Sequence, residues 1–261
     1  MPNESGSSAA QILASRLLGP HARCTPLRRT KHFVSIWEAN GQRIVTKTFT
    51  NTGLEHERRV YECAALNGSG LIPQMLGQHR DTMALEFRPG EMLVDVVDPA
   101  AWAQNFELLR RCVHTIARFH QLAEGLAPPI PDTLPIPGPR GFCHGDTLPH
   151  NLMLDVQRNP FLLDFEHGGR GPLMLDVIPV ASIVPRAQAM QLLAEYYQQR
   201  AWPLQADDET AFCEILRVWP RLRLNRFTDE QKDRTFFDRS DIREKIIRWL
   251  NVAVHLHCMN G

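Results

Sequence analysis

The stretch Phe142–Glu166, FCHGDTLPHNLMLDVQRNPFLLDFE, carries the most informative polar residues of the chain. Asp146 ends a His-Gly-Asp triplet, Asn151 comes five residues later, and Asp164 comes thirteen residues after Asn151. Magnesium prefers hard oxygen ligands such as carboxylate and amide oxygens. A hydroxyl that attacks a phosphate needs a carboxylate that orients it and accepts its proton. A loop with Asp146 and Asn151, followed by a hairpin that presents Asp164, therefore predicts phosphoryl transfer.

The HGDxxxxN and DFE pattern resembles the catalytic loop and the metal-binding motif of the protein-kinase-like superfamily. Within that superfamily it is most similar to the aminoglycoside and choline phosphotransferase branch. The resemblance implies that Asp146 is the catalytic base and that Asn151 and Asp164 bind magnesium. A lone His-Gly-Asp triplet is more often part of an ordinary surface loop. The complete spaced set favours the phosphotransferase interpretation.

Two further segments extend the resemblance. Ala117–Leu122 (ARFHQL) resembles the end of the helix that leads into the catalytic loop of these enzymes. Gly171–Asp176 (GPLMLD) is similar to their GDPxxDL segment. The resemblance covers roughly residues 42–178, and the last eighty or so residues show no motif that we can assign to a family.

The nucleotide side is predicted from a lysine on an apolar strand face. In Ile44–Phe49 (IVTKTF), alternation places Lys47 on the same face as Val45 and Phe49. Burial of an unpaired ammonium is costly, and ATP phosphates would serve as its partner, as for the kinase lysine on the third strand. Glu57 lies on the inward face of the next predicted helix and is expected to pair with Lys47. The alternatives are a solvent-facing lysine at a sheet edge and a solvated glutamate.

The segment Ala84–Gly90 (ALEFRPG) resembles the hinge between the two kinase lobes. By that resemblance the backbone of Glu86 and Phe87 would bind the adenine of ATP. An ordinary strand end followed by a turn explains the same residues almost as well. Both interpretations stay open at this stage.

The segment Leu27–Phe33 (LRRTKHF) departs from the kinase pattern, because a phosphate-covering loop is normally rich in glycine. Its basic residues, Arg28, Arg29 and Lys31, either supply positive charge to the phosphates or form a solvated turn. Glu166 replaces the glycine of DFG, and neither an APE segment nor a lysine two residues after Asp146 is present. These absences argue against a regulated protein kinase.

The hydrophobic pattern predicts an α+β chain with a mixed N-terminal lobe and a mainly helical C-terminal lobe, and the resemblance implies that the two form a bilobal protein-kinase-like fold. We expect a small, mainly β N-lobe over residues 1–88 and a mainly helical C-lobe over residues 89–261. The Asn40-Gly41 dipeptide predicts a tight hairpin, and a proline-rich loop is expected from Pro128 to Pro139. The expected helices are Ala9–Leu18, Leu54–Leu66 (with a Thr52–Glu55 capping box) and Trp102–Leu122; the expected strands are His32–Glu38, Arg43–Thr50, Gln74–Gln78, Thr82–Phe87, Leu152–Asp155 and Phe161–Leu163; beyond Leu173 the chain is expected to be helical, with breaks at Pro179, Pro185, Pro203 and Pro220.

Composition narrows the class of protein. The 29 basic and 29 acidic residues give a formal net charge of zero, so no field of the whole protein favours nucleic acid or a membrane surface. The six cysteines form no CxxC pair and are typical of reduced, buried thiols. No apolar run approaches the roughly 20 residues of a membrane span. We expect a cytoplasmic protein with no integral membrane segment and no nucleic-acid partner.

The acceptor is expected to bind among the C-terminal helices. Four arginines, Arg217, Arg221, Arg223 and Arg226, either meet an anionic acceptor or form a solvated helix face. The leading hypothesis is an ATP- and Mg²⁺-dependent phosphotransferase that acts on a hydroxyl of a small molecule or sugar. The alternatives are a kinase for a larger acceptor, such as a lipopolysaccharide-type glycan or a protein, and a nucleotide-binding pseudokinase.

Overall fold

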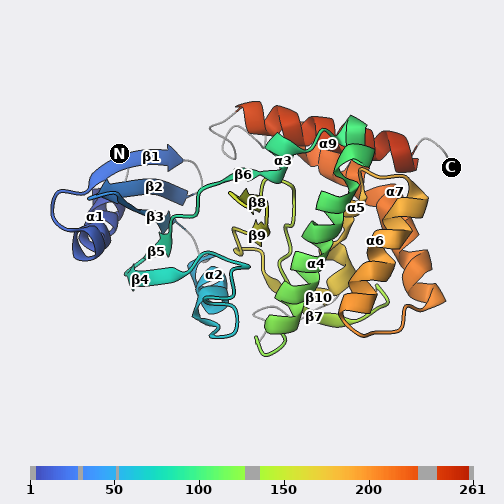
Figure 1. Cartoon of the computed structure of the whole chain (residues 1–261), viewed down its shortest axis with the longest axis horizontal. Helices are drawn as coiled ribbons and strands as arrows, with labels where there is room; N and C mark the ends of the chain where they lie inside the picture. Colours follow the sequence, from blue (N-terminus) through green and yellow to red (C-terminus); the bar gives the residue numbers. More distant parts are fainter. Residues whose placement is uncertain (1–3, 29–31, 51–52, 127–135, 229–239, 259–261) are drawn as a thin grey trace.

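An antiparallel sheet and a helical region occupy the two ends of the molecule (Figure 1). The computed structural model describes residues 4–28, 32–50, 53–126, 136–228 and 240–258. The predicted α+β fold, with a mainly β N-terminal part and a mainly helical C-terminal part, is confirmed. Thr52, Arg29, Lys31 and most of the proline-rich loop lie outside the described residues.

The N-terminal sheet has five antiparallel strands in the order β1-β2-β3-β5-β4. The hairpin predicted at Asn40-Gly41 joins β2 to β3, and both residues have positive φ angles, 52° and 75°. Such angles suit a two-residue hairpin turn. The first strand was not predicted from the sequence, because a proline within a short run argues against a strand. Proline is tolerated here because β1 lies at the edge of the sheet. The bounds are β1 Arg23–Arg28, β2 His32–Ala39, β3 Gln42–Phe49, β4 Met75–His79 and β5 Thr82–Glu86.

Two helices cover opposite faces of this sheet. Helix α1 (Glu4–Leu18) begins earlier than the sequence predicts and buries an apolar stripe against Trp37 and Ile44. Helix α2 (Gly53–Glu62) ends earlier than predicted, and the chain turns after it. Because side chains alternate along a strand, Ile44 faces α1 while its neighbours Val45 and Lys47 face the other side. The lysine therefore points toward the helical part.

Two small sheets support the loop that carries the His-Gly-Asp triplet. The predicted hairpin of β8 (Leu152–Asp155) and β9 (Pro160–Leu162) is confirmed, and β6 (Gly90–Met92) adds a third strand. Strand β7 (Arg140–Cys143) pairs with β10 (Gly169–Pro172). Strands β6, β7 and β10 were not predicted, because three or four residues are too few to show a period of two.

The rest of the chain is helical, as predicted. Helix α4 provides the largest buried face, and α6 packs beside it (Figure 1). The prediction that Pro220 breaks a helix was wrong, since Pro220 lies buried inside α7. Burial of the surrounding helix face compensates there for the missing backbone N–H. The bounds are α3 Leu93–Val96, η1 Pro99–Asn105, α4 Phe106–Leu122, η2 Leu173–Asp176, α5 Ile178–Ala181, α6 Arg186–Gln199, α7 Ala206–Thr228 and α9 Ser240–Cys258.

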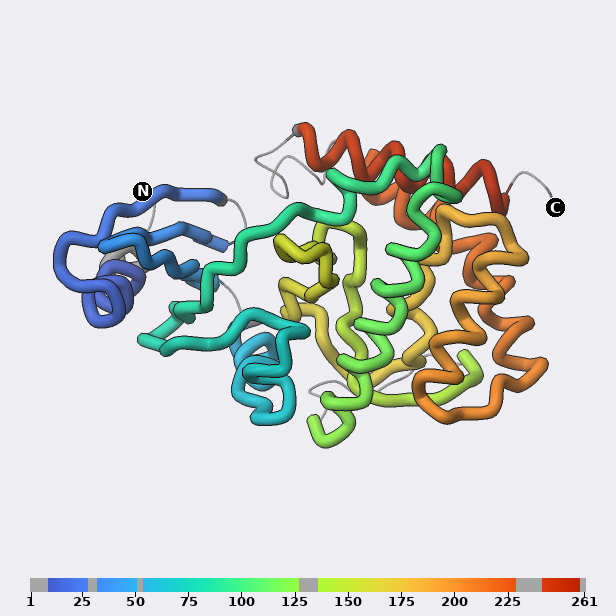
Figure 2. Tube along the Cα trace, in the orientation of Figure 1, coloured from blue at the N-terminus to red at the C-terminus, as the bar shows by residue number. Residues whose placement is uncertain are grey.

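The C-terminal helix α9 returns to the start of the helical part and lies along α3 and η1 (Figure 2). Its buried face joins Ile246 and Leu250 to Leu148, which follows the His-Gly-Asp triplet, and to Phe227 of α7. At the rim, Lys245 Nζ lies 2.6 Å from Asp95 Oδ1. The last helix of the chain thus supports the segment that the sequence singles out for chemistry.

No helix within the described ranges is long and apolar enough to cross a membrane. All six cysteines are free thiols, and Cys112 and Cys143 are buried. Burial raises the pKa of the Cys112 thiol to about 12, so this thiol stays protonated at neutral pH. These two buried cysteines behave as small apolar side chains.

Candidate active site

A cavity of about 400 Å³ lies between the N-terminal sheet and the helical part. Its walls combine apolar residues of the sheet with polar residues of the loop and hairpin predicted to carry chemistry. Helix α9 also reaches it through Ile242. The lining residues include Pro26, Leu27, His32, Val34, Val45, Lys47, Glu57, Tyr61, Leu85, Met92, His150, Asn151, Leu163, Asp164 and Ile242.

Lys47 of β3 connects the two parts of the molecule across this cavity. Its Nζ lies 2.6 Å from Glu57 Oε2 of α2 and 2.6 Å from Asp164 Oδ1, which follows β9. The lysine is 7% exposed and the glutamate 1% exposed, so neither is solvated. The structure thus brings together three of the predicted site residues from three separate segments.

Burial and charge act in opposite directions on this group of residues. Burial disfavours the charged form of Lys47, but the carboxylates of Asp164 and Glu57 outweigh it and hold the lysine pKa above its usual value. Burial raises the pKa of the Glu57 carboxyl to about 7, against the opposing effect of Lys47. The ammonium therefore remains charged at neutral pH and is poised to meet an anion in the cavity.

Asp146 lies beside the cavity and is oriented by Asn151. The Asn151 Nδ2 group donates to the backbone oxygen of Asp146 at 2.8 Å and to its carboxylate Oδ2 at 3.1 Å. The other carboxylate oxygen, Oδ1, is buried and accepts no hydrogen bond among the described residues. Arg223 of α7 approaches this oxygen, with its Nη2 at 3.4 Å. Asp146 therefore has one oxygen held by Asn151 and one buried oxygen that no hydrogen bond among the described residues engages.

Asp176 anchors the loop that carries the His-Gly-Asp triplet. Its carboxylate accepts the backbone N–H groups of His144 (2.6 Å) and Gly145 (3.0 Å) and contacts His120 Nε2 at 2.8 Å. Burial opposes charge on Asp176, but the contact with His120 and the hydrogen bond from the Gly145 N–H outweigh it and lower the carboxyl pKa. The positive φ of Gly145, 82°, brings its backbone so close to His167 that a Cβ would lie 2.3 Å from the His167 oxygen.

His144 holds the loop through hydrogen bonds. The Asp146 N–H donates to His144 Nδ1 at 3.2 Å, so Nε2 carries the proton that it donates to the Leu163 oxygen at 2.8 Å. This second bond links the loop to the residue before Asp164. The ring thereby fixes the distance between the predicted base and the predicted metal ligand.

Glu166, which replaces the glycine of DFG, contacts His32, a partner that no local sequence pattern predicts. Glu166 Oε2 lies 2.6 Å from Nε2 of His32, at the start of β2. Both side chains are almost fully buried, and the His32 ring packs on Phe49 with centroids 4.8 Å apart. The N-terminal sheet and the helical part are therefore joined by a second polar pair, beside that of Lys47 and Asp164.

The predicted adenine-binding residues lie at the end of β5. The Glu86 N–H donates to the Gln74 oxygen at 2.8 Å, and the guanidinium of Arg43 stacks over the Phe87 ring at 4.0 Å. The side chains of Glu86 and Phe87 are not among those that line the cavity, whereas Leu85 and Met92 are. Adenine binding by the backbone of Glu86 and Phe87 stays a prediction.

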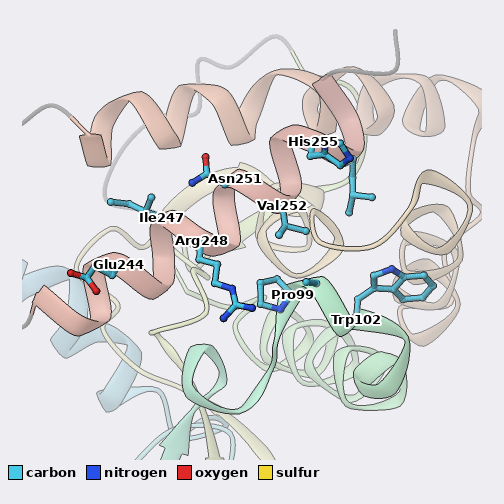
Figure 3. Close-up of a pocket in the computed structure, with 10 residues that line it drawn as sticks. Pro99, Trp102, Glu244, Ile247, Arg248, Asn251, Val252 and His255 are labelled. Atoms are coloured by element: carbon cyan, nitrogen blue, oxygen red, sulfur yellow. The ribbon is translucent and has the colours of Figure 1, made fainter.

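A second cavity, of about 600 Å³, lies between η1 and α9 (Figure 3). Figure 3 shows Pro99 and Trp102 on one wall, with Asn251 and His255 of α9 on the other. None of the predicted site residues lines it. Its position sets it apart from the cavity that contains Lys47 and Asp164.

Comparisons with known proteins agree with this arrangement. Residues 126–224 match the model of the phosphotransferase enzyme family. No curated protein matches the sequence. The chain resembles the macrolide 2′-phosphotransferase of Brachybacterium faecium, with 17% identity, 93% of this chain and 97% of that chain covered, and a TM-score of 0.60.

Two kinases of small molecules have a similar fold. A choline/ethanolamine kinase family protein from Mesorhizobium loti is 14% identical, with 97% of this chain and 98% of that chain covered and a TM-score of 0.56. The choline kinase of Streptococcus pneumoniae is also 14% identical, with 95% of this chain and 99% of that chain covered and a TM-score of 0.56.

The matched segment contains Asp146, Asn151, Asp164 and Asp176, which are the residues that carry the sequence resemblance. The family match supports a phosphotransferase. At these low identities the solved structures bear on the fold alone. Together the family match and the fold confirm the resemblance to the aminoglycoside and choline phosphotransferase branch of the protein-kinase-like superfamily.

Proposed function

We propose that this chain transfers the γ-phosphoryl group of ATP, in the presence of Mg²⁺, to a hydroxyl of a small molecule or sugar. The observation that carries the proposal is the position of Lys47, whose buried ammonium bridges Glu57 and Asp164 across the cavity between the sheet and the helical part. A charged lysine at such a place is suited to the phosphates of a nucleotide.

The cavity has the chemistry expected of a nucleotide site. Apolar side chains such as Val45 and Leu85 line its sheet side, where a base could be sandwiched, and the charged residues lie toward the catalytic loop. Pro26 and Leu27 of β1 also line it, which suggests that an apolar strand end covers the nucleotide in place of a glycine-rich loop. A complex of the similar choline kinase with AMP adds support. We accordingly divide the chain into a nucleotide-binding N-lobe, 1–88, and a C-lobe, 89–261.

Asn151 and Asp164 fit a magnesium ion by the chemistry of their donors. Both line the cavity, and the Nδ2 group of Asn151 is committed to Asp146, so its amide oxygen is the atom left to face the cavity. An amide oxygen and a carboxylate are the hard ligands that Mg²⁺ prefers. When bound there, the ion would neutralise charge on the ATP phosphates.

Asp146 is the base in this proposal. Its Oδ1 would accept the hydrogen bond of the acceptor hydroxyl and take the proton as the new oxygen–phosphorus bond forms. The bond between the γ-phosphorus and the bridging oxygen breaks, and ADP leaves. The Asn151 and Asp176 contacts keep the carboxylate and its loop in place, so little motion is needed before the reaction.

That the acceptor is the hydroxyl of a small molecule follows by analogy from the names of the structural neighbours, a macrolide 2′-phosphotransferase and a choline/ethanolamine kinase family protein; the analogy does not extend to the charge of the acceptor. The free thiols of all six cysteines fit a reducing compartment where ATP is available, and we place the reaction in the cytoplasm. No nucleic acid enters the proposal.

The test is transfer of labelled γ-phosphate from Mg-ATP into a pooled panel of metabolites, aminoglycosides and glycan fragments, with Asp146→Ala as the control. We expect label in one acceptor class with the wild type and none with the variant, while ATP binding by the variant stays within about twofold. Full turnover by Asp146→Ala would remove Asp146 from its role. Absence of nucleotide binding by the wild type would overturn the proposal as a whole.

A further inference from the structure

Arg223 lies on the buried face of α7, where an arginine needs a specific partner. Leu216, Pro220 and Phe227 occupy the same face at helical spacings, and all three are buried. The Arg223 side chain is 24% exposed, and its Nη2 lies 3.4 Å from Asp146 Oδ1. Within the described ranges Asp146 is the only ion-pair partner of this arginine. The guanidinium therefore stands beside the one oxygen that the proposed base has available.

A neighbouring side chain on α7, Trp219, helps to orient the Arg223 guanidinium. Trp219, one turn earlier on α7, packs against the main hydrophobic core and places its ring 5.8 Å from the Arg223 Cζ. The Trp219 ring thus lies within reach of a weak cation–π contact with the guanidinium. A guanidinium has five N–H donors, and a single contact with Asp146 leaves most of them for an incoming group.

The C-terminal part of α7 carries charge of one sign, whereas its N-terminal part is acidic. The segment Ile215–Thr228 carries four arginines and no aspartate or glutamate. Arg217 and Arg221 are exposed, whereas Arg223 faces the catalytic loop. An ammonium group of the acceptor that lay against this part of α7 would be repelled, because Ile215–Thr228 offers arginines and no carboxylate to pair with it.

We propose that Arg223 binds an anionic substituent of the acceptor, so that the substrate is a hydroxyl compound that already carries a phosphate or a carboxylate. This inference rests on the proposed phosphotransferase function and narrows its acceptor class. A guanidinium binds either oxyanion through two parallel hydrogen bonds, which orients the acceptor as well as holding it. The bound oxyanion would also replace Asp146 as the partner of Arg223. Oδ1 of Asp146 would then be free to accept the hydrogen bond of the acceptor hydroxyl.

The test compares four pools of hydroxyl compounds as acceptors: neutral, amine-bearing, carboxylated and phosphorylated. We expect label from γ-labelled Mg-ATP in the carboxylated or the phosphorylated pool, and which of the two is labelled identifies the oxyanion. For the labelled compound, Arg223→Gln should raise the KM about 10- to 100-fold, because a charge-assisted contact is lost, and change kcat far less. Arg223→Lys, which keeps the charge but not the paired donors, should fall between.

Arg221→Gln is the matched control, since Arg221 is exposed on another face of the same helix and should leave both constants unchanged. Label in the neutral or amine-bearing pool alone would overturn the inference. An equal loss of kcat for every acceptor would overturn it too, because Arg223 would then act on the transferred phosphoryl group. If the protein binds Mg-ATP but labels neither anionic pool, this inference fails while the nucleotide site stands; if it binds no Mg-ATP, the proposed function fails first.

Discussion

Lys47 is the residue on which the nucleotide hypothesis depends. Replacement by alanine in Lys47→Ala leaves the carboxylates of Glu57 and Asp164 facing each other without a cation. We expect the dissociation constant for Mg-ATP to rise about tenfold or more, because one charged contact with the phosphates is lost. Titration of the variant with a fluorescent ATP analogue measures this constant.

The control for Lys47→Ala is Lys245→Ala. Lys245 also forms an ion pair at 2.6 Å, with Asp95, but both side chains are partly exposed at the rim of α9. Exposed pairs contribute about 1 kcal/mol or less to the free energy of unfolding, so this variant should bind ATP normally. Unchanged ATP binding by Lys47→Ala would remove the lysine from the site.

The sequence predicts some contacts between residues and not others. Lys47 and Glu57 meet as expected, because strand alternation and helix periodicity each determine which way a side chain points. His32 and Glu166 are in contact although they are 134 residues apart in the sequence. Arg223 reaches the loop residue Asp146 from helix α7. No local pattern encodes such contacts, since they depend on how the elements pack.

At the scale of elements, Asp176 links η2 to the loop that carries Asp146. In Asp176→Asn the shape is kept, but the charge that accepts two backbone N–H groups and contacts His120 is lost. We expect the free energy of unfolding to fall by about 1–3 kcal/mol at neutral pH. Urea unfolding of the wild type and the variant measures the difference, and turnover should fall with it as the loop loses its anchor.

The same pair of proteins should differ in pH dependence. The pKa of Asp176 in the folded protein lies below its ordinary value of 3.8. Its contribution is therefore complete above that value and is lost as the pH falls through the lower, folded pKa. The stability difference between wild type and Asp176→Asn should shrink below about pH 4. A difference that grew on acidification would contradict the assigned role.

The elements themselves were predictable where their pattern was long. The β2–β3 hairpin and α4 have enough residues to show a period, and Asn40-Gly41 supplies a turn with the required backbone angles. Strands β6 and β7 are stabilised by pairing with distant strands and show no pattern of their own. The helix through Pro220 is likewise a consequence of packing, which outweighs the local preference of proline.

At the scale of the molecule, α9 and the catalytic loop share one apolar cluster. Ile246 is fully buried there against Leu148, two residues after the predicted base. Truncation in Ile246→Ala should lower the free energy of unfolding by about 2–5 kcal/mol, because a cavity is left. We also expect kcat to fall while the KM for ATP changes little, since the loop with Asp146 loses support and the nucleotide cavity does not.

Thermal unfolding and steady-state kinetics together check this effect. Val218→Ala is the matched control, because Val218 is an exposed aliphatic residue of α7. Its free energy of unfolding should change by about 0.5 kcal/mol or less, with unaltered turnover. Full activity of a folded Ile246→Ala protein would show that α9 does not act on the loop.

Polar pairs that join the N-terminal sheet to the helical part include Lys47 with Asp164 and His32 with Glu166. We propose that the cavity between these two parts, which is lined by Lys47 and Asp164, is a magnesium–nucleotide site. In that case Asp164 exchanges its contact with the lysine for a metal ion when the nucleotide binds. The sequence predicted the ligands and the lysine, whereas the closeness of the lobes was visible only in the structure.

The most direct measurement is the affinity for ATP with and without Mg²⁺, by calorimetry, for the wild type and for Asp164→Asn. No acceptor is needed. We predict that Mg²⁺ tightens ATP binding about tenfold or more in the wild type and by about twofold or less in the variant. An equal effect of Mg²⁺ on both proteins, or no binding of ATP to the wild type, would contradict the assignment of this cavity.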